Sequence, residues 1–332
     1  MKAENSLISR FRRWIVWAVA GAVLLFVGFS AWAGVTDVGE ALLEFNWLLY
    51  VPVLLLTLLN YGLRFLKWHY LLGRLGVVIN IWENLKFFVA GLAMVISPGK
   101  AGEVLKPYLV RQRTGVPMAT TLPALVTERL TDGIAVLALA GLGVSTYAGD
   151  RVGYVVGPLL LCAVLLAILS HRGLSLTVLG LLGRMPGIAR FSEKLREMYE
   201  AMRVCVAPGP LVLTVAVSFV AWGAECYGFQ LVLNGFGLNA DLGVATFLYA
   251  FATVAGGAMP GGLGVADGAL AGGSLALVAG INEGQAVAAS LLIRVATLWL
   301  GEVLGAIALF GLGDVLGGSS GPEAGEDVAA ST

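Results

Sequence analysis

The chain has 332 residues, of which 58% are hydrophobic and only 13% are charged. Its 21 lysines and arginines balance 21 aspartates and glutamates, so bulk charge gives no reason to expect a nucleic-acid partner. Apolar runs near the twenty residues that cross a bilayer recur along the sequence, which predicts an all-α polytopic membrane protein. The cysteines (Cys162, Cys205, Cys226) and histidines (His69, His171) show no metal or redox spacing, so we expect no metal site and no cofactor.

Six apolar runs are long enough to cross a bilayer completely. The first follows a basic stretch at the N-terminus and exceeds the apolar part of a secretory signal, so we expect it to be a retained anchor. The predicted full transmembrane helices are residues 14–34, 48–66, 119–146, 152–171, 210–233 and 285–312.

Two further apolar regions, 84–112 and 243–280, are each interrupted near the middle by proline and glycine. Each arm has about 9 to 16 residues, and at about 1.5 Å per residue it reaches only part of the way through a hydrocarbon core about 30 Å thick. We therefore expect two re-entrant or broken helical hairpins, whose freed backbone groups are satisfied by protein or by water in a cavity. The predicted hairpin turns are Pro98-Gly99 and Pro260-Gly261-Gly262.

Loop charges predict the orientation. The N-terminus is basic and the loop after the first span is acidic, which places the N-terminus in the cytoplasm. The next connection, with Arg64, Lys67, Arg74 and Lys86, is predicted to return to the cytoplasm. Continuing along the chain, the two hairpins enter from opposite faces and point at each other. We expect an integral protein of a prokaryotic cytoplasmic (inner) membrane with cytoplasmic N- and C-termini.

The two halves of the chain form a weak repeat with inverted topology. In each half a Pro-Gly turn is followed by an arm carrying an acid, Glu103 or Asp267, and then by a full span carrying an arginine, Arg129 or Arg294. Inverted repeats with broken helices that meet near the midplane are a transporter design. We therefore predict a functional site where the two hairpins meet.

The repeat predicts one integral membrane domain, residues 1–312, with halves at about 14–171 and 210–312. The segment between them, 172–208, has apolar residues at helical spacing, which indicates an amphipathic cytoplasmic helix that either connects the halves or senses lipid. The tail, 313–332, is rich in small and acidic residues and is predicted to be disordered.

Ten ionisable side chains fall within the apolar stretches. At about 2.5 to 3.5 kcal/mol for each charge left at the centre of an isolated helix, they would together cost on the order of 25 kcal/mol or more. They must therefore pair with one another or line water. They are Lys100, Glu103, Lys106, Glu128, Arg129, Asp132, Glu225, Asp267, Arg294 and Glu302.

Helical spacing predicts several pairs. Arg129 lies three residues before Asp132, so these two can pair locally while Glu128 remains free to meet another helix. Glu302 lies eight residues after Arg294 and is predicted to pair with it or with a lysine of the other half. An isolated acid such as Glu225 is read as a structural group or as lining for a cavity.

The second arm of the first hairpin carries a mostly basic stripe, Lys100, Glu103 and Lys106, at steps of three residues. Helix N-termini that begin after the two Pro-Gly turns have free N–H groups, which attract anions. Lysine and arginine beside them predict a phosphate site, and both an inorganic ion and a lipid headgroup satisfy that chemistry.

Four stretches of this sequence resemble a known family: GLAMVISPGKAGEVLKPYLV, PALVTERLTDGIAV, MPGGLGVADGALAGG and SLLIRVATLWLGE. From about residue 14 to 312 the chain is similar to the lysylphosphatidylglycerol synthase transmembrane, or flippase-like, family. The resemblance implies lipid translocation, since fused members flip an aminoacylated phospholipid made by their catalytic domain. No soluble transferase domain follows the last span here, so the chain looks like a stand-alone member. By motif position, the resemblance carries over to Lys100, Glu103, Lys106, Glu128, Arg129, Asp132, Asp267 and Arg294 as substrate-binding residues.

The leading hypothesis is a lipid flippase that moves an anionic phospholipid or a polyprenyl-phosphate or isoprenoid lipid, so the expected partners are membrane lipids. The phosphate would lie between the two turns on Lys100, Arg129 and Arg294, with Glu103 and Asp267 pairing with the basic groups when the site is empty. No Gly-x-x-x-x-Gly-Lys-Ser/Thr loop for ATP is present. A gradient acting through Glu128 or Asp132, or mass action, would then supply the driving force.

Two other functions are open. A small-anion or solute transporter could use the same architecture without an opening toward the bilayer. An intramembrane enzyme is suggested only by Gly-Leu-Gly-Asp at 311–314, which resembles a motif of intramembrane aspartyl proteases but lacks the paired aspartate motif on a neighbouring helix. We therefore expect no enzymatic activity.

Overall fold

The computed structural model describes residues 35–97, 102–145 and 192–312. These residues form helices joined by turns and loops, and no strand occurs among them. Several predicted features lie outside the described residues: the spans 14–34 and 152–171, Pro98 and Gly99 of the first turn, Lys100, and the tail 313–332.

Within the described part of the chain, three helical stretches are long and apolar enough to cross a membrane: Trp47–Arg74, Pro208–Asn234 and Glu283–Phe310. They match the spans predicted to begin at residues 48, 210 and 285. The first consists of the short 3-10 helix η1 (Trp47–Leu49) and α3 (Tyr50–Arg74), and the second is α10 (Pro208–Asn234). The third consists of α13 (Glu283–Arg294), a π-helix η7 (Val295–Trp299) and α14 (Leu300–Phe310).

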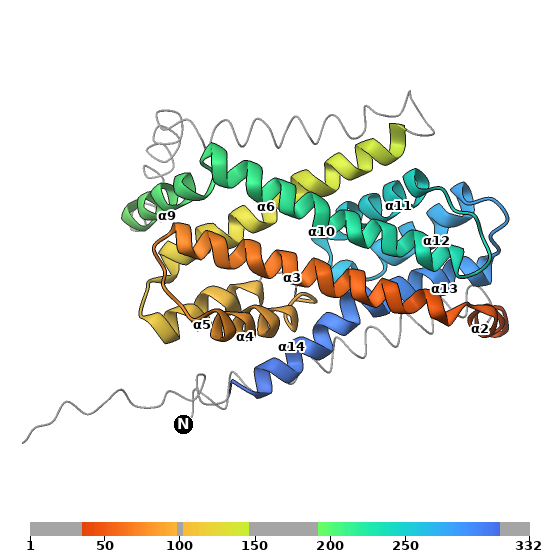
Figure 1. Cartoon of the computed structure of the whole chain (residues 1–332), viewed down its shortest axis with the longest axis horizontal. Helices are drawn as coiled ribbons and strands as arrows, with labels where there is room; N and C mark the ends of the chain where they lie inside the picture. The colour runs from red at the N-terminus through yellow and green to blue at the C-terminus, as the bar shows by residue number, and fades with distance from the viewer. Residues whose placement is uncertain (1–34, 98–101, 146–191, 313–332) are drawn as a thin grey trace, which may run out of the picture.

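Helices α3 and α10 run side by side along the long axis of the molecule (Figure 1). A third long helix, α6 (Met118–Ser145), packs against α10 and α3. Leu55 and Leu66 of α3 and Val220 of α10 are more than half exposed. Large apolar side chains on the outside of a helix suit contact with lipid.

Each interrupted apolar region folds as two short helices that pack on each other. The first unit is α4 (Ile81–Leu92) and α5 (Leu105–Thr114). The second is α11 (Leu242–Ala255) and α12 (Val265–Leu277), joined by two 3-10 turns, η5 (Gly256–Ala258) and η6 (Pro260–Gly262). Figure 1 shows the α4–α5 unit at one end of the long axis and the α11–α12 unit toward the other.

The turn of the second unit depends on glycine. Gly261, Gly262 and Gly264 have φ angles of 59°, 71° and 79°. Residues with a Cβ rarely adopt positive φ, whereas glycine does so without steric cost. The glycines in Met259-Pro260-Gly261-Gly262-Leu263-Gly264 therefore allow the chain to turn sharply between η5 and α12.

The two units meet at their turns. A Cβ placed on Gly261 would lie 3.1 Å from Ile96 Cγ1 and 3.5 Å from Ile96 Cα. Ile96 is followed directly by Ser97, the last described residue before the first turn. The described edge of the first turn thus contacts the second turn, although the two lie far apart in the sequence.

Two apolar clusters surround this meeting point. Trp68 and Phe87 are central to a cluster of α3, α4 and α5, and Phe229 and Leu248 to one of α10 and α11. Two shorter helices complete the ends: α2 (Val35–Glu44) packs on α13, and α9 (Ser192–Cys205) packs on α6.

Helix α9 falls within the predicted amphipathic segment 172–208. Its Tyr199 and Met202 are buried, and the Thr127 hydroxyl of α6 donates to Met202 Sδ at 3.4 Å. These contacts make the described part of this segment a packed helix on α6.

The prediction that Arg64 and Lys67 belong to a cytoplasmic connection is wrong. Helix α3 continues to Arg74, and both side chains are buried within it, with exposed fractions of 8% and 2%. They enter the protein interior because carboxylates on α6 face them there. Arg74 ends α3 and Lys86 lies in α4, so these two basic residues flank that connection.

Candidate functional site

Seven charged side chains form one buried network within the described residues. They come from α3, from the turn before α5, from α5 itself and from α6. We call this set the ion network. Its cations are Arg64, Lys67, Lys106 and Arg129, and its carboxylates are Glu103, Glu128 and Asp132.

Lys106 joins α5 to α6. Its Nζ donates to Glu128 Oε2 at 2.6 Å and lies 4.8 Å and 5.0 Å from the ring centroids of Trp68 and Phe88. A Cβ on Gly91 of α4 would lie 2.6 Å from Lys106 Cγ, so only glycine leaves room for this side chain. The buried Lys106 ammonium is therefore stabilised by an ion pair with a carboxylate and by cation–π contacts with two aromatic rings.

Lys67 joins α3 to α6 and α10. Its Nζ lies 2.5 Å from Asp132 Oδ1, 2.7 Å from the Ser218 hydroxyl and 3.3 Å from the Thr131 hydroxyl. The backbone carbonyl of Glu128 also accepts from it at 3.2 Å. These four acceptors are more than the three donors of the ammonium can each serve singly, so Lys67 is fully satisfied and acts as a cross-link between helices.

Arg129 contacts all three carboxylates of the ion network. Its guanidinium nitrogens lie 2.9 Å from Glu103, 2.8 Å from Glu128 and 3.6 Å from Asp132. At 26%, its side chain is the most exposed of the network. All three guanidinium nitrogens therefore contact a carboxylate, while the side chain still lines open space.

Across from the network, Arg294 forms a separate pair with Asp267. Arg294 Nε donates to Asp267 Oδ1 at 3.0 Å, and Nη2 donates to the backbone carbonyl of Gly261. The other Asp267 oxygen accepts from the backbone N–H of Gly264 at 2.8 Å, at the start of α12. The arginine and the second turn therefore hold each other in place.

Glu225, in the middle of α10, is a further buried acid. It is 4% exposed and accepts a hydrogen bond from the Tyr249 hydroxyl of α11. Among the described residues, no lysine or arginine nitrogen lies within 4.0 Å of its carboxylate. Its partner is a neutral phenol.

A cavity lies between the ion network and the Asp267–Arg294 pair. It offers about 90 Å³ to the centres of water molecules, and since about 10 to 15 Å³ of such volume holds one water, it has room for several waters or a phosphate-sized group. Its charged and turn residues are Arg64, Glu103, Arg129, Glu225, Gly261, Gly262 and Arg294.

A protein-family model described as the lysylphosphatidylglycerol synthase TM region matches residues 15–305 of the chain. The chain belongs to this family. A comparison with curated proteins gave no match. The match spans the ion network, both helix–turn–helix units and the cavity. Together with the three apolar helices, it makes this family member a membrane protein whose domain type is linked to lipid handling.

The structure divides the predicted site residues of this family member into two groups. Glu103, Arg129 and Arg294 line the same cavity. Asp267 does not line the cavity, but it holds Arg294, which does, through a hydrogen bond. Buried residues that do not line it are Lys106, Glu128 and Asp132, which hold Arg129 or its neighbours in place.

Sequence reasoning missed the roles of Arg64 and Lys67. A usable signal was present, because the polar residues Thr57, Asn60, Arg64 and Lys67 recur at steps of three and four along an otherwise apolar run. This is the spacing of one helix face. All four are buried, so the stripe marks the side of α3 that faces the interior.

The predicted pairing of Glu302 with Arg294 is also corrected. Its Oε1 accepts from the backbone N–H of Ile96 at 3.2 Å. The alternative partner, a lysine of the other half, includes Lys100, which lies outside the described residues. The donors of Arg294 are directed to Asp267 and Gly261 instead. Glu302 thereby ties α14 to the described edge of the first turn.

Proposed function

We propose that this protein moves a lipid with an anionic, phosphate-bearing headgroup between the leaflets of a prokaryotic cytoplasmic membrane. The observation that supports it is the single cavity into which Arg129 and Arg294 project from distant parts of the chain, beside the meeting point of two turns. Guanidinium groups bind phosphate through paired, charge-assisted hydrogen bonds. The substrate class is an anionic phospholipid or a polyprenyl-phosphate or isoprenoid lipid.

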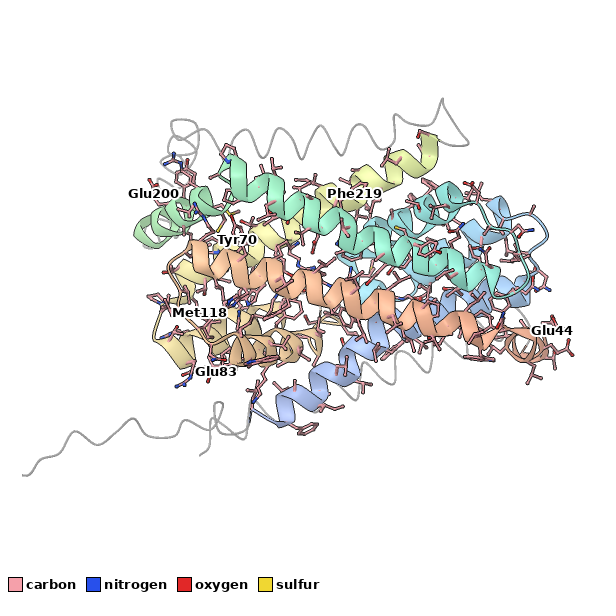
Figure 2. The ribbon with its side chains drawn as sticks, viewed as in Figure 1. Glu44, Tyr70, Glu83, Met118, Glu200 and Phe219 are labelled. Atoms are coloured by element: carbon pink, nitrogen blue, oxygen red, sulfur yellow. The ribbon has the colours of Figure 1, made fainter. Side chains whose placement is uncertain are left out.

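The proposed architecture is one membrane domain, residues 1–312, with six full helices and two re-entrant hairpins in an inverted repeat. The position of the α4–α5 and α11–α12 units toward opposite ends, with their turns in contact, supports it. Exposed Trp47 and Trp82 lie beside Glu44 and Glu83, which Figure 2 labels at opposite ends of the long axis. Tryptophan prefers the two membrane interfaces, so the bilayer normal would run along this axis. We propose, from the loop charges, that both termini are cytoplasmic.

In the proposed mechanism, the headgroup enters the cavity while the acyl chains remain in the bilayer. When the cavity is empty, Glu103 and Asp267 neutralise Arg129 and Arg294 at 2.9 Å and 3.0 Å. A phosphate replaces part of these contacts with its own, so no arginine is left as a bare buried charge at any stage. Lys100, which belongs to the first turn, is proposed to add a third cation. No covalent step is part of this mechanism.

A small-anion transporter is the second candidate, and the size of the cavity favours it. The space holds a phosphate-sized group, and an inorganic anion would use the same arginines without any contact to the bilayer. The two candidates share the binding chemistry and differ in whether the cargo carries acyl chains.

The test is a proteoliposome assay with fluorescently labelled phosphatidylglycerol and, in parallel, radiolabelled phosphate. We expect the wild type to move the lipid, and Arg129→Gln and Arg294→Gln each to slow it by about tenfold or more, since a hydrogen bond to a charged group contributes about 1.5–3 kcal/mol. Arg113→Gln is the matched control, because Arg113 lies at the surface with 57% of its side chain exposed.

The outcomes separate the candidates. Lipid movement that depends on both arginines supports the flippase. Phosphate uptake without lipid movement replaces it with the anion transporter. If the purified wild type moves neither cargo, or if the Arg129 and Arg294 variants match the wild type, the proposed site is wrong.

A further inference from the structure

Glu225 differs from the other carboxylates around the cavity. Glu103 lies 2.9 Å from Arg129, and Asp267 lies 3.0 Å from Arg294. Glu225 lines the cavity directly but has, within the described residues, only the Tyr249 hydroxyl as a close partner. A carboxylate in a poorly hydrated site without a cation costs far more to ionise than one in water.

The groups around Glu225 come from every helix that packs near it. Arg64 of α3 and Arg294 of α13 are the cations that act on it electrostatically, and both line the same cavity. None of these cations forms an ion pair with it at 4.0 Å or less in the described structure. The titratable and charged side chains that line this part of the cavity are Tyr61 and Arg64 of α3, Glu103 before α5, Arg129 of α6, Tyr249 of α11 and Arg294 of α13. Asp132 of α6 and Cys226 of α10 interact electrostatically with Glu225 without lining the cavity.

We infer that Glu225 is a proton-binding site that couples headgroup binding to proton binding, so that one proton and one anionic lipid move together. This inference rests on the proposed function. An ionised Glu225 and a phosphate in the same small cavity would repel each other strongly at low dielectric. Protonation of the Glu225 carboxyl removes that repulsion. The neutral carboxyl can then accept from Tyr249 through one oxygen and donate to the phosphate through the other.

The other acids are poor candidates for this role. Glu128 is contacted by Lys106 at 2.6 Å and by Arg129 at 2.8 Å, and Asp132 by Lys67 at 2.5 Å. A close cation favours the ionised form of a carboxyl, and neither group lines the cavity. From the sequence, Glu128 or Asp132 was the expected route for a driving gradient; we assign proton binding to Glu225 instead.

Thermodynamic linkage relates the effect of the headgroup on proton affinity to the effect of the proton on headgroup affinity. If the bound headgroup raises proton affinity by some factor, the bound proton raises headgroup affinity by the same factor, and such factors are typically about 5 to 150. For a headgroup with a single negative charge, the loaded cavity carries no added charge. A proton gradient would then drive the lipid toward the leaflet that faces the less acidic side.

The first test measures proton uptake on binding, with the full chain in detergent and a pH indicator in weakly buffered solution. Short-chain phosphatidylglycerol is the probe. We expect the wild type to take up a proton as the lipid binds, and Glu225→Gln to bind the lipid without proton uptake. Glu225→Asp should restore uptake. Glu302→Gln is the matched control, because Glu302 is a half-buried carboxyl that does not line the cavity, and it should behave as the wild type.

The second test imposes a pH gradient on proteoliposomes containing fluorescent phosphatidylglycerol. The gradient should accelerate wild-type lipid movement, whereas Glu225→Gln should exchange lipid at one rate with or without it. Wild-type lipid movement without proton uptake, or a gradient response retained in Glu225→Gln, overturns this inference while leaving the flippase in place. A wild type that neither binds nor moves the lipid overturns both.

Discussion

Buried charge is arranged differently on the two sides of the cavity. On one side, four cations and three carboxylates of α3, α5 and α6 contact one another, so that each carboxylate has at least one cation within 4.0 Å. On the other side, the described structure has the single pair Asp267–Arg294, completed by the backbone of Gly261 and Gly264.

The difference shows two ways to make a buried arginine tolerable. Arg129 is stabilised by several side chains, so its position depends on α6 and on the turn before α5 together. Arg294 is stabilised by one carboxylate and by a glycine-rich turn, so its position depends on local backbone conformation. Removing a member of the ion network should therefore damage the fold more than removing a member of the pair.

The largest effect is expected from Glu128→Leu. The change leaves Lys106 and one edge of Arg129 without their carboxylate, and removing one partner of a buried ion pair costs about 3–5 kcal/mol. Thermal unfolding in detergent and the yield of monodisperse protein measure this loss. The double variant Glu128→Leu/Lys106→Met should recover part of it, because it removes both buried charges. A loss no larger than that of a surface variant would contradict the comparison.

A smaller effect on stability is expected from Arg294→Lys. Lysine keeps the charge but cannot reach Asp267 and the Gly261 carbonyl as a guanidinium fork does, which removes about 1.5–3 kcal/mol of charged hydrogen bonding. The same thermal unfolding measurement applies, and lipid movement in proteoliposomes should fall more steeply than stability does. Destabilisation equal to that of Glu128→Leu would mean that the two sides are equivalent.

Gly261→Ala tests the backbone half of the pair. The φ of 59° costs an L-residue about 1–2 kcal/mol, and the new methyl group would lie 3.1 Å from Ile96. Gly268→Ala in α12 is the matched control, since a Cβ there meets nothing within 4 Å. We expect the control to be neutral or slightly stabilising by thermal unfolding. Equal behaviour of the two variants would show that the turn does not depend on glycine.

The smallest effect is expected at the surface. Glu83 and Arg113 form a pair at 2.6 Å, with side chains 28% and 57% exposed. Exposed pairs contribute about 0–1 kcal/mol, so Glu83→Gln should leave thermal unfolding and lipid movement nearly unchanged. A loss comparable to that of Arg294→Lys would show that the distance between the charged groups of an ion pair matters more for stability in this protein than their burial does.

Much of the helical pattern could be predicted from the sequence, because apolar run length and Pro-Gly interruptions report on it directly. The spans beginning at 48, 210 and 285 correspond to long helices. The regions 84–112 and 243–280 each contain two short helices in place of one long span. The prediction for Arg64 and Lys67 is wrong because loop-charge reasoning places basic residues near the end of a span in water. Here both side chains instead pair with a carboxylate of α6 in the protein interior.

The site could be predicted only in part. Spacing within α6 predicted the Arg129–Asp132 pair, which lies at 3.6 Å. Contacts between different helices could not be predicted, because no local sequence pattern shows which helix packs against which. The contact of Lys67 with Ser218 and that of Tyr249 with Glu225 both depend on how α10 packs.

The close approach of α14 to the end of α4 bears on how the protein is made. A Cβ on Gly305 would lie 2.2 Å from the Ala93 nitrogen, so the last described helix rests directly on backbone from the first helix–turn–helix unit. Synthesis proceeds from the N-terminus, so α4 is in place long before α14 is translated. The face of α4 around Ala93 must therefore be shielded by lipid or by the insertion machinery until the chain is nearly complete. A premature stop before α14 would yield a product with every member of the ion network and an uncovered α4.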